Sequence, residues 1–309
     1  MSYFRAFAAK CVLALCVLPS AMACDLGIST QAHKAADYVD GVRICLKYTP
    51  SDFTYDEDLE RDNMARVNQA RAERGLPGLL LREDLRPAAR WHSLDMAANQ
   101  FFAHIGADGR DHSDRIALLD RTLLTDKSGE NLAMMRGYLE RRDVNKSMHE
   151  GLMESPGHRE NLLAEYYTHM AVGVVRYKDG VWLTQIFANE AGELSEPVPV
   201  RLAPGQTFTP EADLKGWYSE QIGAKHGSQL TMFETPDYID DPIIPHDLKG
   251  EITIRVRGDR RPPDNDGQVF YLNVPGPKAT VLKPRSRADV KPAAPGHLKE
   301  TTQLPPEAS

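Results

Sequence analysis

A stretch from Phe101 to Phe187 decides the fold of this chain, because it holds four short motifs in a fixed order. They are Phe101-Phe102-Ala103-His104, Gly129-Glu130-Asn131-Leu132-Ala133, Ser155-Pro156-Gly157-His158-Arg159-Glu160-Asn161-Leu162-Leu163 and Trp182-Leu183-Thr184-Gln185-Ile186-Phe187. Each motif alone is short and weakly specific. Their order and spacing place imidazole and carboxylate side chains on separate elements, which a compact fold can bring to one cleft.

The sequence around these motifs predicts helices followed by an antiparallel sheet. Apolar residues at helical spacing, with start and stop signals, predict helices at 58–74, 84–99, 113–119 and 143–153 and a helical turn at 160–163. Two β-rich runs, 170–177 and 181–188, are joined by Lys178-Asp179-Gly180, and Asp-Gly between such runs is typical of a hairpin. Residues 57–190 are therefore expected to form an α+β domain.

The rest of the chain divides by composition. Residues 24–56 are expected to be an irregular extension with strand character at 42–48. Proline-punctuated β-like runs predict a small β-rich domain over 191–275, with runs at 198–202, 229–234, 251–257 and 268–274. Residues 276–309 are rich in Pro, Lys and Ala and almost free of aromatic residues, which predicts a disordered tail.

The first 23 residues have the features of an export signal. Arg5 and Lys10 precede an apolar run that is too short to span a bilayer, and Ala21-Met22-Ala23 is a small-x-small cleavage site. A signal peptide at 1–23 predicts a periplasmic or extracellular protein without a transmembrane helix in the mature chain.

The two cysteines outside the signal, Cys24 and Cys45, are an even pair suited to an oxidising compartment, which predicts a disulfide. The alternative is lipidation of Cys24 as the first mature residue.

Charge excludes one class of partner. Without its first 23 residues the chain has 35 basic and 44 acidic residues. This acidic balance argues against nucleic acid and against an anionic membrane face as the main partner.

The side chains of the motifs suggest site chemistry. Glu130 lies between Gly129 and Asn131 and beside apolar residues, so a buried carboxylate there needs a partner, and His104 is a suitable one. Such a pair can be structural, can prepare a His for proton transfer, or can bind a divalent metal such as zinc together with His158. No Gly-rich phosphate loop, nucleophile elbow or Cys-x-x-Cys spacing is present.

The four motifs, with Asn63-Met64-Ala65-Arg66-Val67-Asn68 and the segment from Leu85 to Ala97, resemble the CAP superfamily. This superfamily, also called the SCP domain, includes cysteine-rich secretory proteins, antigen 5 and pathogenesis-related 1 proteins. The similarity is greatest to its bacterial branch, which lacks the domain cysteines. The resemblance implies an α-β-α sandwich and an extracytoplasmic protein whose cleft binds a ligand or partner.

The resemblance also implies which residues line that cleft. The family has two His and two Glu there, and His104 and Glu130 match one of each. Ser155 occupies the position of the second Glu, and Trp182 that of the second His, while His158 offers an imidazole from a neighbouring turn. The expected cleft residues are His104, Glu130, Asn131, Ser155, His158, Arg159, Trp182 and Gln185.

Three hypotheses for the cleft stay open at this point. The first is a non-enzymatic module that binds a small, lipid-like ligand or a protein or envelope partner. The second is a hydrolase, with or without a bound divalent metal, that acts on peptide or cell-envelope polymer with His104 or His158 as the base. The third is a scaffold whose cleft residues only hold the fold together.

Overall fold

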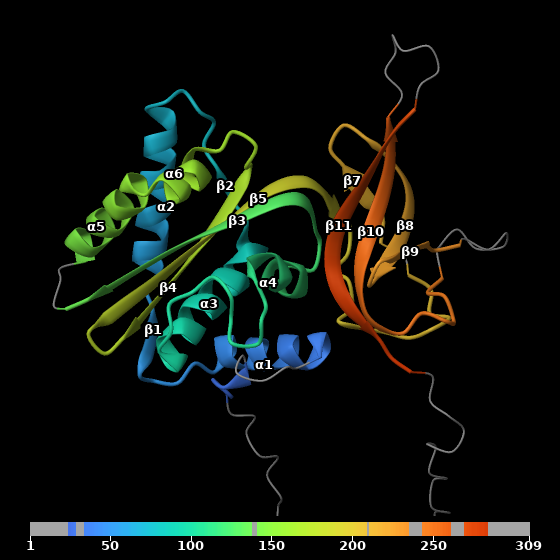
Figure 1. Ribbon diagram of the computed structural model, residues 1–309, viewed down its shortest axis with the longest axis horizontal. Helices are drawn as coiled ribbons and strands as arrows, with labels where there is room; N and C mark the ends of the chain where they lie inside the picture. Colours follow the sequence, from blue (N-terminus) through green and yellow to red (C-terminus); the bar gives the residue numbers. More distant parts are fainter. Residues whose placement is uncertain are drawn as a thin grey trace, which may run out of the picture.

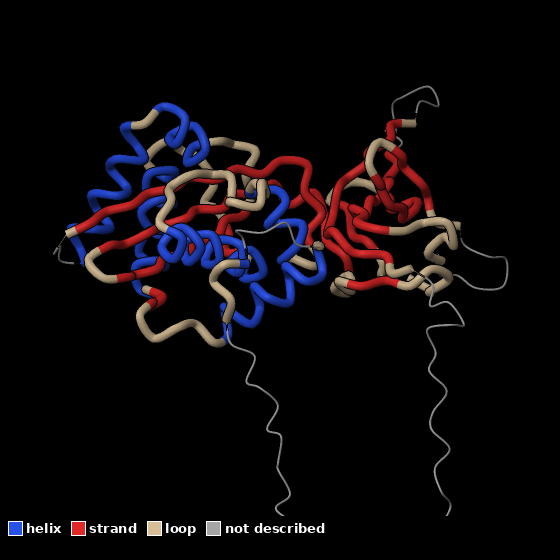
Figure 2. Tube along the Cα trace, turned by 60° about the horizontal axis from the view of Figure 1, so that its bottom comes forward, coloured by secondary structure: helices blue, strands red, loops and turns tan. Residues whose placement is uncertain are grey.

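The computed structural model describes residues 24–28, 34–137, 141–208, 210–234, 243–260 and 269–283. The export signal expected at 1–23 lies outside these residues, as does most of the tail expected from 276. Figures 1 and 2 show two bodies side by side, one containing all the helices of the described residues and one built of strands.

The first body is a sheet between two layers of helices. Its main strands follow the order β1 (Phe53–Tyr55), β4 (His169–Tyr177), β5 (Gly180–Leu194) and β3 (Leu123–Arg136), with β2 (Leu80–Leu81) parallel to β4 and β7 (Ala212–Leu214) paired with β5. One face packs against α2 (Glu57–Ala72), α5 (Arg141–Glu154) and α6 (Pro156–Leu163). The other packs against α1 (Ala35–Lys47), α3 (Arg86–Asn99) and α4 (His112–Leu119). This is the α-β-α sandwich that the resemblance to the CAP superfamily implies.

Local signals in the sequence explain where the helices begin and end. Asp56 caps α2 by accepting from the backbone N–H of Leu59, and Asp111 caps α4 through the N–H of Asp114. Both caps satisfy donors that have no partner within the helix. Pro87 lies in the first turn of α3, where its missing N–H costs nothing.

The extension at 24–56 differs from its prediction. Residues 42–48, expected to have strand character, lie largely in helix α1, which ends at Lys47, and Val42 is buried against α3. Strand β1 adds to the edge of β4. Cys24 and Cys45 form the predicted disulfide, which joins the start of the described chain to α1. The extension is thus part of the sandwich rather than an irregular lead to it.

A second difference concerns Glu130. The Gly129-Glu130-Asn131 segment lies in the middle of the long strand β3, which pairs with β5 over most of its length and was not among the predicted elements. The sequence hides this strand, because Asp, Lys, Ser and Gly follow one another at 126–129 and such a run is typical of a turn. An added Cβ at Gly129 would collide with the hydroxyl of Tyr167, so the glycine permits a close approach.

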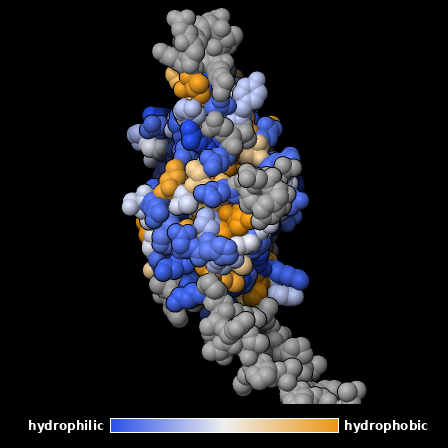
Figure 3. Space-filling model, turned by 90° about the vertical axis from the view of Figure 1, so that its right-hand side faces the viewer, coloured by the Kyte–Doolittle hydropathy of each residue, from blue (hydrophilic) through white to orange (hydrophobic). Residues whose placement is uncertain are grey.

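The second body is a five-stranded sheet in the order β6 (Arg201–Leu202), β11 (Phe270–Val281), β10 (Gly250–Arg260), β8 (Tyr218–His226) and β9 (Gln229–Met232). It confirms the β-rich region. Strand β8 was not expected from the sequence. Strand β11 continues to Val281, so the boundary expected at 275 falls inside a strand. The outer end of this domain is mainly hydrophilic, with small separated apolar patches (Figure 3).

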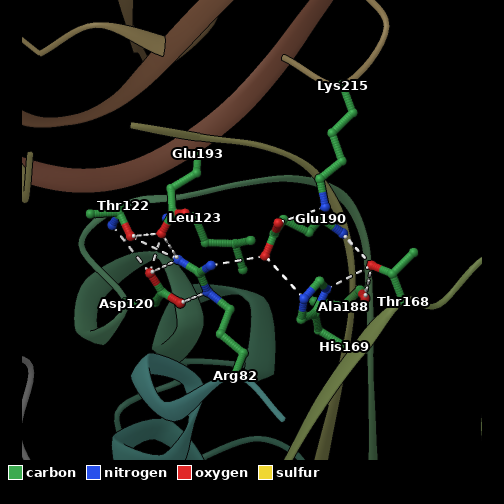
Figure 4. A network of polar contacts seen from close by, with 10 residues as sticks. All are labelled: Arg82, Asp120, Thr122, Leu123, Thr168, His169, Ala188, Glu190, Glu193 and Lys215. Carbon is green, nitrogen blue, oxygen red and sulfur yellow. Dashed lines mark hydrogen bonds and ion pairs between the residues drawn. The ribbon is translucent and has the colours of Figure 1, made fainter. Parts of the chain in front are cut away.

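A buried polar network lies where the two bodies meet (Figure 4). Arg82 is 8% exposed and contacts Asp120 at 2.6 Å, Glu190 at 2.9 Å and Glu193 at 3.0 Å. Lys215, just after β7, reaches Glu190 at 2.6 Å, and His169 approaches the same carboxylate at 3.4 Å. The cations of Arg82 and Lys215 thus compensate these acids, which accounts for the buried charges of Arg82, Asp120 and Glu190.

A second arginine fixes the two bodies directly. Arg121 is buried and donates to backbone carbonyls of both, including Leu118 at 3.1 Å, Val198 at 3.0 Å and Lys278 at 2.7 Å. No helix among the described residues has the length and apolar character needed to cross a membrane.

Candidate functional site

The site centres on a contact between His104 and Glu130. Nδ1 of His104 lies 2.8 Å from Oε1 of Glu130. Glu130 is buried on β3, whereas the side chain of His104, in the loop after α3, is 49% exposed. These two residues, which are 26 positions apart, are therefore in contact, and the imidazole lies between a buried acid and solvent.

The other oxygen of the carboxylate is held by Arg115. Nη2 of this residue on α4 donates to Oε2 of Glu130 at 2.6 Å and to the carbonyl of His104 at 3.1 Å. Arg115 is almost fully buried, so the ion pair is shielded from water. Arg115 thus neutralises the acid and also fixes the loop that carries His104.

A second imidazole, that of His92, contacts the loop that carries His104. His92 on α3 is fully buried, and its Nε2 lies 3.0 Å from the carbonyl of Ala103, next to His104. Because a carbonyl only accepts, Nε2 carries the proton. Burial, then the charge of Arg115, lowers the pKa of His92 to about 3. The ring is neutral at ordinary pH, with an unpartnered, buried Nδ1.

The charge state of Glu130 sets the tautomer of His104. Burial alone raises the pKa of Glu130, but the hydrogen bond from His104 and the charge of Arg115 outweigh it, so this pKa lies below its usual value. An ionised carboxylate only accepts hydrogen bonds, so Nδ1 of His104 must donate. In the neutral ring Nε2 is then the basic nitrogen, and it can accept a hydrogen bond from a ligand or take a proton.

Three expected residues lie on the neighbouring helix α6. His158 is half-buried, and burial followed by the charge of His104 lowers its pKa. Ser155 is the N-cap residue of α6 but forms no side-chain cap, and Arg159 is exposed and donates to the carbonyl of Met153 at 3.2 Å. Arg159 therefore serves the turn rather than the His104–Glu130 pair.

Asn131 and Gln185 belong to a different network. They lie opposite each other on β3 and β5, and Nδ2 of Asn131 donates to Gln185 at 3.1 Å and to the carbonyl of His158 at 3.0 Å. Gln185 in turn donates to Asn63 on α2 at 2.7 Å. This chain of amides ties α2 and α6 to the sheet, so its observed role is structural.

Trp182 is not near the pair. It lies opposite Met134, four residues along β3 from Glu130, which corresponds to roughly 13 Å at the rise of a strand. Its side chain is 2% exposed and packs in the core with Trp91 and Val175. The structure places Trp182 in the core of the sandwich.

The expected metal ligands do not form a metal centre. No group of three or more His, Cys, Asp or Glu side chains in the described part of the chain is arranged to hold a metal ion. Both oxygens of Glu130 already accept hydrogen bonds, and Arg115 would repel a cation there. His104, Glu130 and His158 therefore do not fit a three-ligand zinc site.

Sequence reasoning missed Arg115, the residue that organises the site. It lies in an ordinary-looking helix, and an arginine on a predicted helix normally indicates a solvated face. His92 gave a partial signal, since it interrupts the apolar stripe of α3. Its role depends on the position of Ala103, which the sequence does not reveal.

Comparisons with known proteins agree with this architecture. Residues 64–187 match the family model of the cysteine-rich secretory protein family, CAP. The uncharacterized membrane protein YlbC of Bacillus subtilis (strain 168) is 31% identical over 117 residues, which is 38% of this chain and 32% of that protein. The chain thus spans about a third of the length of this curated relative.

Solved structures with similarity to the chain were also found. An extracellular SCP-domain protein from Bacillus anthracis str. Ames is 27% identical, with a TM-score of 0.37, and the match covers 43% of this chain and 41% of the other. A cysteine-rich secretory protein from Staphylococcus aureus subsp. aureus Mu50 is 19% identical, with a TM-score of 0.34 and coverages of 43% and 39%. An outer surface protein from Borrelia burgdorferi is 16% identical, with a TM-score of 0.38 and coverages of 44% and 98%.

The family match spans β3, β4 and most of β5 together with α3 to α6, and it includes His104 and Glu130. Residues 64–187 are therefore similar to the CAP family, and a β-rich domain follows this part of the chain.

Proposed function

We propose that this protein is an extracytoplasmic binding module whose recognition site is the half-exposed imidazole of His104. The observation that carries the proposal is the 2.8 Å contact of Nδ1 with Glu130, because it fixes the ring and directs its basic nitrogen to the solvent side. Arg115 donates to Glu130 and to the carbonyl of His104, so the orientation of the imidazole is fixed before a ligand binds. A fixed binding group loses little conformational entropy when it binds.

The chemistry of the pair favours binding over metal-assisted hydrolysis. The acid is already neutralised, and no third ligand completes a metal site among the described residues. His158 on α6 would provide a second imidazole for the same ligand. The ligand in this proposal is a small molecule, or a segment of an envelope partner, that donates a hydrogen bond to His104.

The location outside the cytoplasm rests on two observations. Cys24 and Cys45 form a disulfide, and structural disulfides persist in oxidising compartments. The residues before Cys24 have the features of an export signal, namely basic residues, a short apolar run and a small-x-small cleavage site. The β-rich domain is attached through Arg121, so it would move with the CAP domain as a single binding body.

The test is ligand retention. The mature protein is incubated with a cell-envelope extract, purified again and analysed by native mass spectrometry, in parallel with His104→Gln and with His226→Gln as the matched control. His226 is an exposed histidine of the second domain whose Nδ1 contacts the carbonyl of Glu251. The proposal expects an adduct on the wild type and the control that His104→Gln lacks. Equal retention by all three would refute it.

A second function has one observation in its favour. A histidine oriented by a carboxylate is also the arrangement of a general base, so the same contact would suit a metal-independent hydrolase of peptide or envelope polymer. Incubation with casein and with purified peptidoglycan separates the two. Product formation that disappears in His104→Gln would establish the hydrolase, whereas retention without turnover supports the binding module.

A further inference from the structure

The outward face of the second sheet is rich in polar and aromatic side chains. Residues of β10 alternate between the two faces, so Ile254 and Val256 point into the apolar core while Arg255 and Arg257 point away from it. Strands β8 and β11 flank β10 on its two sides (Figure 1). The two arginines therefore lie in the middle of a sheet face, away from its edges.

Two exposed tyrosines lie at one end of this face. Tyr218 of β8 and Tyr271 of β11 both lie opposite Asp259 of β10, so the three side chains are on the same face. Tyr218 is 75% exposed and Tyr271 is 56% exposed, whereas Asp259 is buried. The two tyrosines are two strand spacings apart, which corresponds to about 10 Å. Their flat, amphipathic rings are available to stack against one extended ligand.

Arg257 adds donors beside one of these rings. Its guanidinium carbon lies 4.2 Å from the centre of the Tyr271 ring. Stacking engages the flat face of a guanidinium, whereas carboxylate binding uses the N–H donors in its plane, so one arginine can do both. Exposed Asn273 lies opposite Arg257 on the same face. This end of the face thus combines two rings with polar groups.

Arg255 is short of hydrogen-bond partners. Its Nε is buried and has no partner among the described residues, and its Nη1 reaches the carbonyl of Asn273 only at 3.4 Å. Burial lowers the pKa of this guanidinium. A buried donor without a partner is costly, so an acceptor that reaches Arg255 would be favoured.

Positive charge prevails among the described side chains of this face. The cations are Lys225, Arg255, Arg257 and Lys278, and the described acids are Glu251 and Asp259. Asp259 is buried, and Glu251 pairs with Lys278 at 3.4 Å. The described charge around the two tyrosines is therefore mainly cationic, and a negatively charged ligand is complementary to it.

We propose that this face binds a segment of an acidic polysaccharide, whose sugar rings stack on Tyr218 and Tyr271. The carboxylates of the sugar chain pair with Arg255 and Arg257, and Asn273 binds sugar hydroxyl groups. One side of a sugar ring is a flat C–H surface that packs on an aromatic ring, whereas the rim carries the hydroxyl and carboxylate groups. An acidic peptide suits the face less well, because β10 is paired on both sides and offers no free backbone edge to a peptide strand.

Affinity electrophoresis of the mature protein in native gels tests the proposal. Separate gels contain polygalacturonate, alginate or hyaluronate, which are acidic, methyl-esterified polygalacturonate, whose carboxylates are neutralised, or poly-glutamate. At least one acidic polysaccharide is expected to retard the protein with an affinity at least about tenfold higher than that of the methyl ester. Added salt should weaken the retardation, because it screens exposed charges.

Variants of the rings then assign the site. Tyr218→Ala combined with Tyr271→Ala is expected to weaken polysaccharide binding by at least about tenfold, because both stacking surfaces are lost. Tyr48→Ala is the matched control and is expected to bind as the wild type does. Tyr48 is 55% exposed in the first body, and its ring centre lies 5.1 Å from the amino group of Lys47.

Charge variants provide a second measurement. Arg257→Gln is expected to weaken binding, whereas Arg61→Gln, which removes an exposed arginine of α2, is expected to leave it unchanged. His104→Gln is also expected to bind the polysaccharide as the wild type does, because this site is independent of the proposed role of His104.

Circular dichroism confirms that each variant is folded. The proposal would be overturned by the absence of retardation in all three acidic polysaccharides, by equal retardation in the methyl ester, or by equal binding of the double tyrosine variant. Tighter binding of poly-glutamate than of every polysaccharide would also overturn it and would assign the face to an acidic peptide.

Discussion

The side chains of Glu130 and Asn131, adjacent on β3, lie on opposite faces of the central sheet. Glu130 contacts His104 and Arg115 on the side of α3 and α4, whereas Asn131 contacts Gln185 and Asn161 on the side of α6. The alternation of a strand requires this separation. A single motif thus serves two purposes, since one residue builds the candidate site and the next fastens the helices behind it.

Removal of Arg115 is expected to destabilise the protein strongly. In Arg115→Met the buried carboxylate of Glu130 loses its main positive partner, and breaking a buried ion pair typically costs about 3–5 kcal/mol. Urea denaturation of the variant measures the free energy of unfolding. Arg61→Met, which breaks an exposed pair with Asp58, is the control and is expected to cost less than about 1 kcal/mol. Similar losses in both would contradict the role of Arg115.

His92 is expected to make stability depend on pH. Its pKa is about 3 in the folded protein against a usual value of 6.5, so between these values the unfolded chain binds a proton that the folded protein does not. Stability from this residue is therefore complete above pH 6.5 and falls as the pH drops, by about 2–3 kcal/mol between pH 6.5 and pH 4.5.

The measurement for His92 is the free energy of unfolding against pH. His92→Gln keeps a donor for the carbonyl of Ala103. In this variant the loss of stability between about pH 6.5 and pH 4.5 should be smaller than in the wild type by about 2–3 kcal/mol. His226→Gln, on the surface of the second domain, should keep the slope of the wild type. An unchanged slope in His92→Gln would show that the ring is not held neutral.

Two glycines are expected to differ in their tolerance of alanine. At Gly173 an added Cβ would collide with the backbone of Ala89 and Arg90, where α3 crosses β4, so the helix itself must move. At Gly129 the obstacle is the hydroxyl at the end of the Tyr167 side chain. Gly129→Ala should cost about 1–3 kcal/mol, and Gly173→Ala more.

A second substitution checks the cause at Gly129. Tyr167→Phe removes the obstructing hydroxyl, so Gly129→Ala should cost less in that background than in the wild type, whereas Gly173→Ala should cost the same in both. Thermal unfolding of these single and double variants provides the comparison. Additive effects for Gly129 and Tyr167 would rule out the collision as the reason.

The Cys24–Cys45 disulfide is expected to stabilise the sandwich. It closes a loop with a sequence separation of 21 residues and holds the first described residues against α1. A loop of that size contributes about 3 kcal/mol, so Cys24→Ser with Cys45→Ser should lower the free energy of unfolding by that order. Equal stability of the wild type with and without reductant would argue against this contribution.

Part of the site could be predicted because its signals are local. His104 and Glu130 occur in short motifs, and a buried carboxylate requires a partner, which made an imidazole from the same set of motifs a reasonable choice. Arg115 could not be assigned in this way. The contacts of Arg115 depend on α4 packing against the loop that carries His104. Nothing in the sequence around Arg115 indicates that packing.

The same distinction applies to the fold. The helices from α2 to α6 and the β4–β5 hairpin follow from periodicity, caps and an Asp-Gly turn, which act within a few residues. The helix α1 was predicted as an irregular segment with strand character, because its β-branched residues favour strands in isolation. Burial of Val42 and Cys45 against α3 outweighs that preference.

The sequence by itself predicted the helices, the β4–β5 hairpin, the Cys24–Cys45 disulfide and the pairing of His104 with Glu130, because their signals lie in short segments of the chain. Its motifs also carry the resemblance to the CAP superfamily, which implies the α-β-α sandwich. Only the tertiary structure decided that Arg115 neutralises Glu130, that Trp182 is a core residue and that two exposed tyrosines share one face of the second sheet. These features depend on contacts between segments that are distant in sequence, and their geometry is fixed by how the layers pack.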